Sequence, residues 1–442
     1  MKKLILITIL TFALSAKSQE SVQNHSFSLE EAIAHALTNN YSAINAGRDI
    51  EVAKKKKWET TAMGLPQISA GLDYQNYLKQ PVILADFNQD GTNEEFFFGT
   101  KQNVSAKATL NQLIFDGSYI VALQASKTYL KFYQNAKEKT DVEIREMVIN
   151  SYGNVLLAEE SIAILERNKS TLEKTLFDTK ETFKNGLIEE ENVEQLQITL
   201  ASINSSLNNT KRLKEIAYKM LKINLGIEIN NDLKLTDKLD NLTKNNLDLA
   251  LSQSEFDITN NVDYQMGLNF QDQKKLELKL EKSKALPSLN AFVNYGVTAN
   301  NDEFKYLSDN QKWFDSSLLG VSLNVPIFSS LARSARTQQA KIAFEQAKTK
   351  LTETEQKLKL QYENAKSQYE FSIEQYDTSK NNLSLAERIE KKQQIKFTEG
   401  LSSSYEFSEA QRQLYAAQQS YLQSMVDVIN KKASLEKIIN KQ

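Results

Sequence analysis

The chain contains two copies of one architecture, and this internal repeat restricts its folds more than any other feature. Three kinds of segment recur in the same order, between 213 and 221 residues apart. The matching segments are 65–74 with 286–295, 110–115 with 323–328, and 183–187 with 397–401. Each half reads as a helix, a β-hairpin and two very long helices. A period this long is not that of a short solenoid unit, so we expect two building blocks of a larger symmetric assembly.

Composition favours long helices. The 442 residues include 13 glycines and 4 prolines, and residues 327–399 contain neither. A continuous helix over that stretch would be about 110 Å long, far beyond the roughly 11–12 residues of an average globular helix. We therefore expect a mainly α, extended rod or tube.

The charge of the chain does not suggest nucleic acid binding, since the formal net charge is −2 and no basic stripe carries interleaved aromatic residues. The run Lys54–Lys57 fits a solvated helix face. The chain has no cysteine, which excludes a disulfide framework and thiol chemistry.

Residues 1–18 have the pattern of a signal peptide, with Lys2-Lys3 before an apolar stretch and small residues at Ala16 and Ser18. We expect cleavage before Gln19, which would leave a net charge of −5 once Lys2, Lys3 and Lys17 are removed. The mature protein would then act outside the cytoplasm. A signal anchor is the alternative, but the apolar run is too short to span a bilayer.

The predicted strands alternate apolar and polar residues with period two. The apolar positions are Ile68, Ala70, Leu72 and Tyr74 with Val104, Ala106, Ala108 and Leu110, and Leu289, Ala291, Val293, Tyr295 and Val297 with Leu319, Val321, Leu323 and Val325. A soluble sheet with one buried face is one interpretation, but the available helices are polar. A membrane barrel with its apolar face outward fits better. Four strands cannot close a pore and lipid forbids open edges, so several chains would share the barrel.

Local signals mark the helix ends. Ser28 and Glu31 predict a capping box that opens a first helix running to about Met63. Gly186 and Gly400 predict tight helix–helix turns. Residues 227–248, after Gly226, read as an irregular connector.

A set of motifs runs through nearly all of the mature chain. These motifs are Leu29–Ile33 with Ala36-Leu37 and Asn39-Asn40, the Leu-Pro strand starts at 65 and 286, Val325–Phe328, and the turn Lys396–Ser403. No one motif is specific, but the doubled set resembles the TolC family of outer-membrane efflux proteins.

The resemblance implies a homotrimer whose chains each contribute four strands to one 12-stranded outer-membrane β-barrel, with long coiled-coil helices forming an α-barrel in the periplasm. It implies an exit duct of a tripartite efflux pump or type I secretion system, served by a periplasmic adaptor and an inner-membrane pump. The expected division is 1–18 signal peptide, 19–64 first helix, 65–115 first hairpin with an extracellular loop, 116–226 first helical hairpin, 227–248 equatorial connector, 249–285 first helix of the second repeat, 286–328 second hairpin and 329–442 second helical hairpin.

The resemblance also suggests site residues at the two helical tips. Contacts to the adaptor are expected from Phe183, Gly186, Leu187, Phe397, Gly400, Leu401 and Ser403. Ordinary turn chemistry is the alternative explanation for the same residues. The family tip usually has a basic residue before the aromatic one, as at Lys396 but not at Thr182, so unequal docking of the two tips is expected.

An acidic constriction is a second hypothesis for the tips, formed by Glu189, Glu190, Glu399 and Glu406 in threefold repetition. Carboxylates favoured by helix N-termini are the alternative explanation. Further along the chain, Asp86–Gly91 matches the start of a calcium loop, but Phe97 stands where its last ligand should be. A polar loop with an Asp-Gly turn is the better interpretation, and we expect no metal or cofactor.

Catalysis has little support in the sequence. The two histidines are His25 and His35, and we find no phosphate loop, nucleophile elbow or His/Cys cluster. The predicted function is a passive outer-membrane channel rather than an enzyme. Its rivals are a periplasmic coiled-coil scaffold without a pore and an exported hydrolase with a helical stalk.

Overall fold

The computed structural model describes residues 24–85, 91, 93–97, 99–248, 251 and 256–440, so the predicted signal peptide lies outside it. The chain divides into two compact units. One, called here the helical unit, comprises residues 1–48, 135–265 and 354–442; the other, the sheet unit, comprises 49–134 and 266–353. No helix in the described ranges has an apolar stretch long enough to cross a bilayer.

The elements follow the repeat in chain order. They are β1 (Asn24–Phe27), α2 (Leu29–Asn39), α3 (Tyr41–Ala62), β2 (Gln67–Asn76), β3 (Val82–Ala85), β4 (Glu94–Phe97), β5 (Gln102–Asp116), α4 (Gly117–Lys184), α5 (Glu190–Leu225), β6 (Asp232–Leu235), α6 (Leu239–Asn245), the 3-10 helix η1 (Ile258–Asn260), α8 (Val262–Ser283), β7 (Ser288–Asn301), β8 (Phe314–Asn324), α9 (Ala332–Thr398) and α10 (Ser404–Ile439). The mainly α fold built from two repeats is confirmed.

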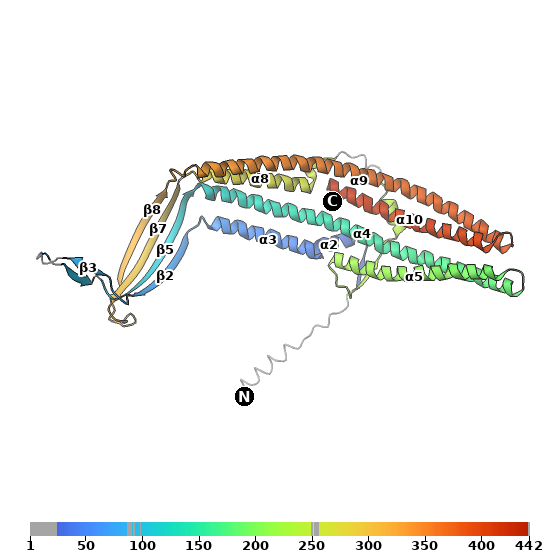
Figure 1. Ribbon diagram of the computed structural model, residues 1–442, viewed down its shortest axis with the longest axis horizontal. Helices are drawn as coiled ribbons and strands as arrows, with labels where there is room; N and C mark the ends of the chain where they lie inside the picture. Colours follow the sequence, from blue (N-terminus) through green and yellow to red (C-terminus); the bar gives the residue numbers. More distant parts are fainter. Residues whose placement is uncertain are drawn as a thin grey trace, which may run out of the picture. The chain divides into compact units, whose positions relative to one another are not determined.

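The sheet unit holds one antiparallel sheet in the order β2-β5-β7-β8 (Figure 1). The two predicted hairpins join side by side through β5 and β7, which leaves β2 and β8 as the edges. Register places Leu72, Ala106 and Val297 in one row across three strands. The predicted separation of apolar and polar faces is therefore confirmed.

The two faces of this sheet differ in chemistry. On the apolar face, Leu319 is 72% exposed and Ile68 is 75% exposed. On the other face, polar side chains bond across β5 and β7: Asn103 Nδ2 donates to Asn300 Oδ1 at 2.6 Å, and Thr109 Oγ1 to Asn294 Oδ1 at 2.8 Å. The polar face thus forms hydrogen bonds among its own side chains, although Phe292 and Leu318 also lie on it, whereas the apolar face is exposed in the single chain.

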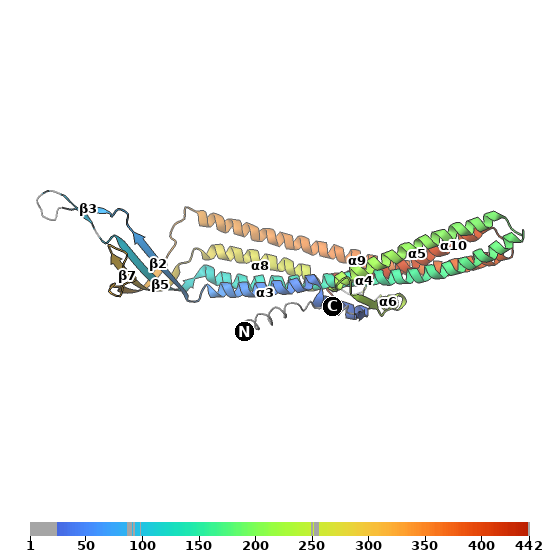
Figure 2. The ribbon, with the colours of Figure 1, turned by 90° about the horizontal axis from the view of Figure 1, so that it is seen from below.

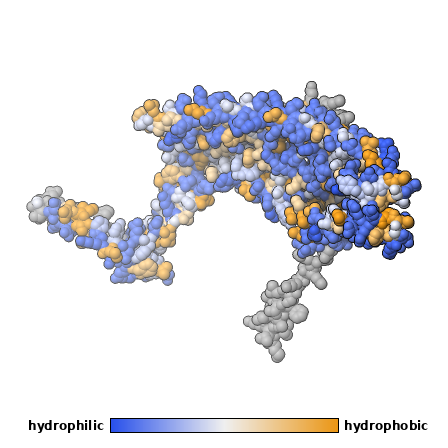
Figure 3. Space-filling model, turned by 45° about the vertical axis from the view of Figure 1, so that its right-hand side comes forward, coloured by the Kyte–Doolittle hydropathy of each residue, from blue (hydrophilic) through white to orange (hydrophobic). Residues whose placement is uncertain are grey.

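A second small hairpin, β3–β4, lies where the sequence predicted only a loop. Val82 pairs with Phe97 and Ile83 with Phe96. These β-branched and aromatic residues favour extended backbone, which explains the strands. Apolar side chains gather over this hairpin on the face shown in Figure 3.

The expected single first helix, running to Met63, is wrong. Asn40 has extended backbone and divides the segment into α2 and α3, and the predicted capping box at Ser28 and Glu31 opens α2. Asn40 Oδ1 accepts the backbone N–H of Ser42 at 2.8 Å, while its Nδ2 donates to the carbonyl oxygen of Asn224 at 2.7 Å.

The second repeat uses the same device at Asn261. Its Oδ1 accepts the N–H of Asp263 at 2.9 Å, and its Nδ2 donates to the carbonyl oxygen of Ile438 at 2.8 Å. Both asparagines are buried. Each therefore starts one helix while binding the end of a helix about 180 residues away in sequence.

The expected irregular connector, residues 227–248, is ordered instead. Its strand β6 pairs in parallel with β1, and its helix α6 buries Leu239 and Thr243. Tyr152 Oη donates toward the carbonyl oxygen of Phe27 and the carboxylate of Asp237, both at 3.0 Å. Burial raises the pKa of Tyr152. Apolar and polar contacts thus fix a segment whose composition suggested a loop.

Candidate functional site

Two helical turns, α4–α5 and α9–α10, lie at the same end of the helical unit (Figures 1 and 2). Their backbones are equivalent. Gly186 and Gly400 have φ values of 69° and 72°, the left-handed conformation that glycine adopts without strain. The N–H of Leu187 reaches the carbonyl oxygen of Thr182, and that of Leu401 reaches Lys396. Both turns are Schellman caps, as the two glycines predicted.

The helices that leave the two turns begin differently. Ser403 caps α10 in a capping box, in which the Glu406 carboxylate accepts the N–H of Ser403 at 3.0 Å. Glu189 occupies the same position before α5 but makes no side-chain capping bond. Ser403 and Glu406 therefore stabilise the first turn of α10, whereas the carboxylate of Glu189 does not cap α5.

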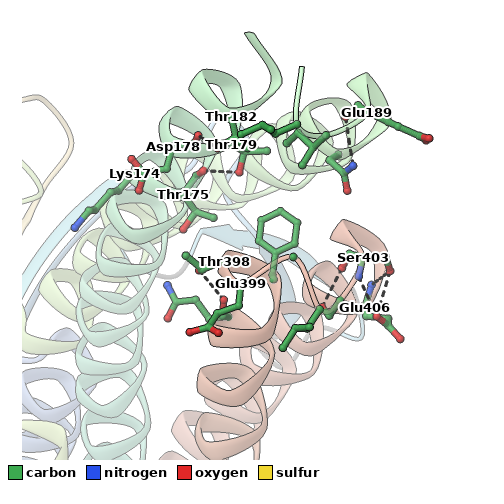
Figure 4. Close-up of a pocket in the computed structure, with 18 of the residues that line it drawn as sticks. Lys174, Thr175, Asp178, Thr179, Thr182, Glu189, Thr398, Glu399, Ser403 and Glu406 are labelled. Carbon is green, nitrogen blue, oxygen red and sulfur yellow. Dashed lines mark hydrogen bonds between the residues drawn. The ribbon is translucent and has the colours of Figure 1, made fainter. Parts of the chain in front are cut away.

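A cavity of about 1200 Å³ lies between the two turns (Figure 4). Its walls are the last turns of α4 and α9 and the first residues of α5 and α10. Asn192 closes one side, since its Oδ1 accepts the N–H of Ser404 at 3.2 Å. The sequence analysis did not single out Asn192.

The apolar tip residues fall into two groups. Phe397 stacks on the fully buried Phe407, with ring centroids 5.2 Å apart and planes 11° apart. Leu187 and Leu401 are 74% and 75% exposed. Phe397 therefore stabilises its own turn. The two leucines are exposed to a partner, as is Phe183 at 37%.

Carboxylates dominate the charged groups that line the cavity. Asp178, Glu189, Glu399 and Glu406 line it with one cation, Lys174. Threonine hydroxyls add polar surface along α4, where Thr179 Oγ1 donates to the carbonyl oxygen of Thr175 at 2.8 Å (Figure 4). Three of the four glutamates suggested by the sequence are thus brought together, but Glu190 is not among the lining residues.

Two turns before the α9–α10 tip, Glu390 is half-buried with no ion pair or hydrogen bond to the residues that the structure describes. Burial raises its pKa above the usual range of a glutamate. The same position of the first repeat holds Leu176, a core residue. Aligning Glu390 with Leu176 of the first repeat would have revealed an acidic residue at a core position. The sequence analysis missed this residue.

Replacing Glu390 with leucine is expected to stabilise the protein more at about pH 8 than at about pH 4. Between the glutamate pKa of the unfolded chain and the higher pKa of folded Glu390, the folded chain keeps a proton that the unfolded chain has lost. Glu390 therefore lowers the stability of the fold as pH rises through that interval. Thermal unfolding of detergent-solubilised protein measures the difference. The exposed Glu387, replaced in the same way, is the control for removing a carboxylate from the surface of the same helix. Equal shifts for both variants would contradict the assignment.

Metal binding finds little support in the described ranges, where no cluster of three or more His, Asp or Glu residues could hold an ion. His25 and His35 lie beside Phe27 as an aromatic group instead. Of the calcium-like segment, residues 86–90 lie outside the described part of the chain.

Comparison with known protein families gives one match. Residues 271–441 match the sequence pattern of the family described as outer membrane efflux protein. No curated protein sequence matches the chain.

Solved structures match almost the whole fold. The CmeC outer membrane channel of Campylobacter jejuni is 19% identical, with a TM-score of 0.72 over 96% of this chain and 90% of CmeC. The outer membrane protein VceC of Vibrio cholerae is 13% identical, with a TM-score of 0.71 over 93% and 95%. The MtrE outer membrane channel of Neisseria gonorrhoeae, in its open state, is 17% identical, with a TM-score of 0.70 over 93% and 88%. At these identities the likeness is one of fold.

Proposed function

We propose that this chain, whose residues 271–441 match the outer membrane efflux protein family, is one subunit of a trimeric outer-membrane channel. The resemblance to the TolC family seen in the sequence is thereby confirmed. In this proposal the channel passes substrates passively from a periplasmic adaptor and an inner-membrane pump to the exterior, and the chain itself is not an enzyme.

The sheet is the observation that carries the proposal. It has one bare apolar face, one hydrogen-bonded polar face and two unpaired edges, β2 and β8. Water would not favour such a sheet, and lipid would not accept its open edges. Both costs disappear if β8 of one chain pairs with β2 of the next and the polar faces surround a pore. Three chains would give about twelve strands, within the range of membrane barrels.

Strand lengths support this placement. The strands contain 10, 15, 14 and 11 residues, and about 9–11 suffice to cross a bilayer when tilted. In this reading the hairpins of residues 65–115 and 286–328 form the barrel, and the helices extend into the periplasm. A coiled-coil scaffold without a pore leaves the exposed apolar face unexplained.

The tip cavity is the proposed periplasmic entrance. Because carboxylates outnumber cations around it, three copies would favour cations at the mouth. The double variant Glu189→Gln/Glu399→Gln is expected to lower the cation selectivity of single channels in planar bilayers, read from the reversal potential in a salt gradient. Glu190→Gln, whose side chain does not line the cavity, should change it little. Absence of any conductance from the parent protein would refute the channel.

The exposed leucines are the proposed adaptor contact. The chain has no cysteine, so a single cysteine can be placed at Leu401 or Leu187 without further changes. We expect a bis-maleimide to join Leu401→Cys to a periplasmic protein with a helical hairpin in intact cells, with the adduct identified by mass spectrometry. Leu385→Cys, exposed on α9 about four turns before the tip, is the control. An adduct of equal yield at both positions would argue against docking at the tip.

A further inference from the structure

A groove of about 530 Å³ runs along α8 in the sheet unit. Helix α8 lies between α4 and α9 in both ribbon views (Figures 1 and 2). The groove takes its walls from all three helices, including Gln124 and Thr128 of α4 and Phe344 of α9. Its volume suits a small organic molecule.

Lysines form the polar part of the groove. Lys275, Lys279 and Lys282 are spaced by four and three residues, so they share one face of α8. Lys279 Nζ donates to Gln124 Oε1 at 2.7 Å, and its other two N–H groups have no acceptor among the described residues. Lys275 and Lys282 form no ion pair with the residues that the structure describes. Asp272 is the one carboxylate lining the groove, which leaves a local excess of positive charge.

Apolar groups form the rest of the surface. Leu276, Leu278 and Phe344 line the groove and are half-buried. The ammonium of Lys348 lies 4.4 Å from the centre of the Phe344 ring, but it is paired with Glu345 at 3.0 Å and adds no net charge. If these lysines were only a solvated helix face, no apolar surface would be expected beside them, between two flanking helices.

We propose that this groove binds a small amphiphilic anion, with its carboxylate, sulfonate or phosphate on the three lysines and its apolar body on Leu276, Leu278 and Phe344. An inorganic anion would leave the apolar surface unused, and a neutral hydrophobic molecule would leave the lysines without a partner. The anion can be a solute in transit or an acidic lipid, since both present this chemistry. The site does not depend on the proposed channel, because binding is a property of the purified chain.

Equilibrium dialysis of naphthalene-2-sulfonate against the full-length protein in a neutral maltoside detergent tests the site, with protein-free micelles subtracted. We expect saturable binding of one molecule per chain. The triple variant Lys275→Ala/Lys279→Ala/Lys282→Ala should bind at least tenfold more weakly. The control removes three lysines from α3, the corresponding helix of the first repeat, at Lys54, Lys55 and Lys57, and should bind as the parent does.

Two further probes define the ligand class. Naphthalene-2-sulfonamide, which has the same body without the charge, should bind at least tenfold more weakly than the sulfonate. Competition by phosphatidylglycerol in mixed micelles would identify a lipid source, and competition by soluble aromatic sulfonates alone would identify a solute. The proposal is overturned if the triple variant binds as the parent does, or if the control variant loses binding equally. Neither result would bear on the channel, which is tested by conductance.

Discussion

Replacing Leu319 with arginine is expected to remove most folded protein from the outer membrane. Leu319 lies in the middle of the edge strand β8, is 72% exposed and pairs with Val293 on the apolar face. If that face contacts lipid, an arginine near the bilayer midplane costs about 2–4 kcal/mol per chain. Three chains share one barrel in our account, so the cost is multiplied in the assembly. Detergent extraction of outer membranes followed by gel filtration measures the loss.

The control for this variant lies on the same strand and the opposite face. Ser316 pairs with Gly296, whose lack of a side chain leaves room for a longer one. The polar face already carries Lys107, opposite the same glycine. Ser316→Arg should therefore assemble in nearly normal amounts. If Leu319→Arg assembles as well as Ser316→Arg, the apolar face does not meet lipid.

Replacing Gly226 with alanine is expected to destabilise the helical unit by about 3–5 kcal/mol, at the upper end of single substitutions. Gly226 ends α5 at φ 73°, which alone costs a non-glycine residue about 1–2 kcal/mol. Its added Cβ would lie 2.0 Å from the carbonyl oxygen of Asn39. Because that atom belongs to the backbone, the junction between α2 and α3 must move, and the bond from Asn40 to Asn224 is threatened with it.

Gly400 provides the matched control. It has φ 72°, but an added Cβ would meet no atom within 4 Å. Gly400→Ala should therefore cost only the backbone strain, about 1–2 kcal/mol. Thermal unfolding of both variants, followed by circular dichroism, separates strain from steric clash. Equal destabilisation would show that packing against Asn39 contributes nothing.

The repeat made much of this fold predictable. Strand alternation, the two Gly-Leu turns and the long helices free of glycine and proline are local signals, and each appears in the structure. The capping box at Ser28 is equally local. These features depend on neighbours within a few residues, so one sequence was enough to predict them.

The errors concern contacts over long sequence distances. The Asn39-Asn40 pair was visible as a repeated motif, but its function depends on Asn224, 184 residues from Asn40. The order within residues 227–248 depends on pairing with β1 at the other end of the repeat. Composition cannot reveal such partners.

In the candidate site, too, local features were predicted and features that depend on distant contacts were not. The sequence located both turns, yet it could not show that Glu406 is held by Ser403, that Phe397 packs inward, or that Glu190 stays out of the cavity. These distinctions depend on the rotation of each helix about its axis. A motif does not specify that rotation, but packing does.

The number of chains in the native particle tests the central claim most directly. Light scattering of protein extracted from outer membranes in mild detergent, with the detergent contribution subtracted, measures that number. The account predicts three chains per particle. The two unpaired sheet edges of each chain require a closed ring of several chains, and the resemblance to the TolC family implies that the ring contains three. A monomer in detergent, or recovery of the protein in the soluble periplasmic fraction, would contradict the shared barrel and favour the scaffold without a pore.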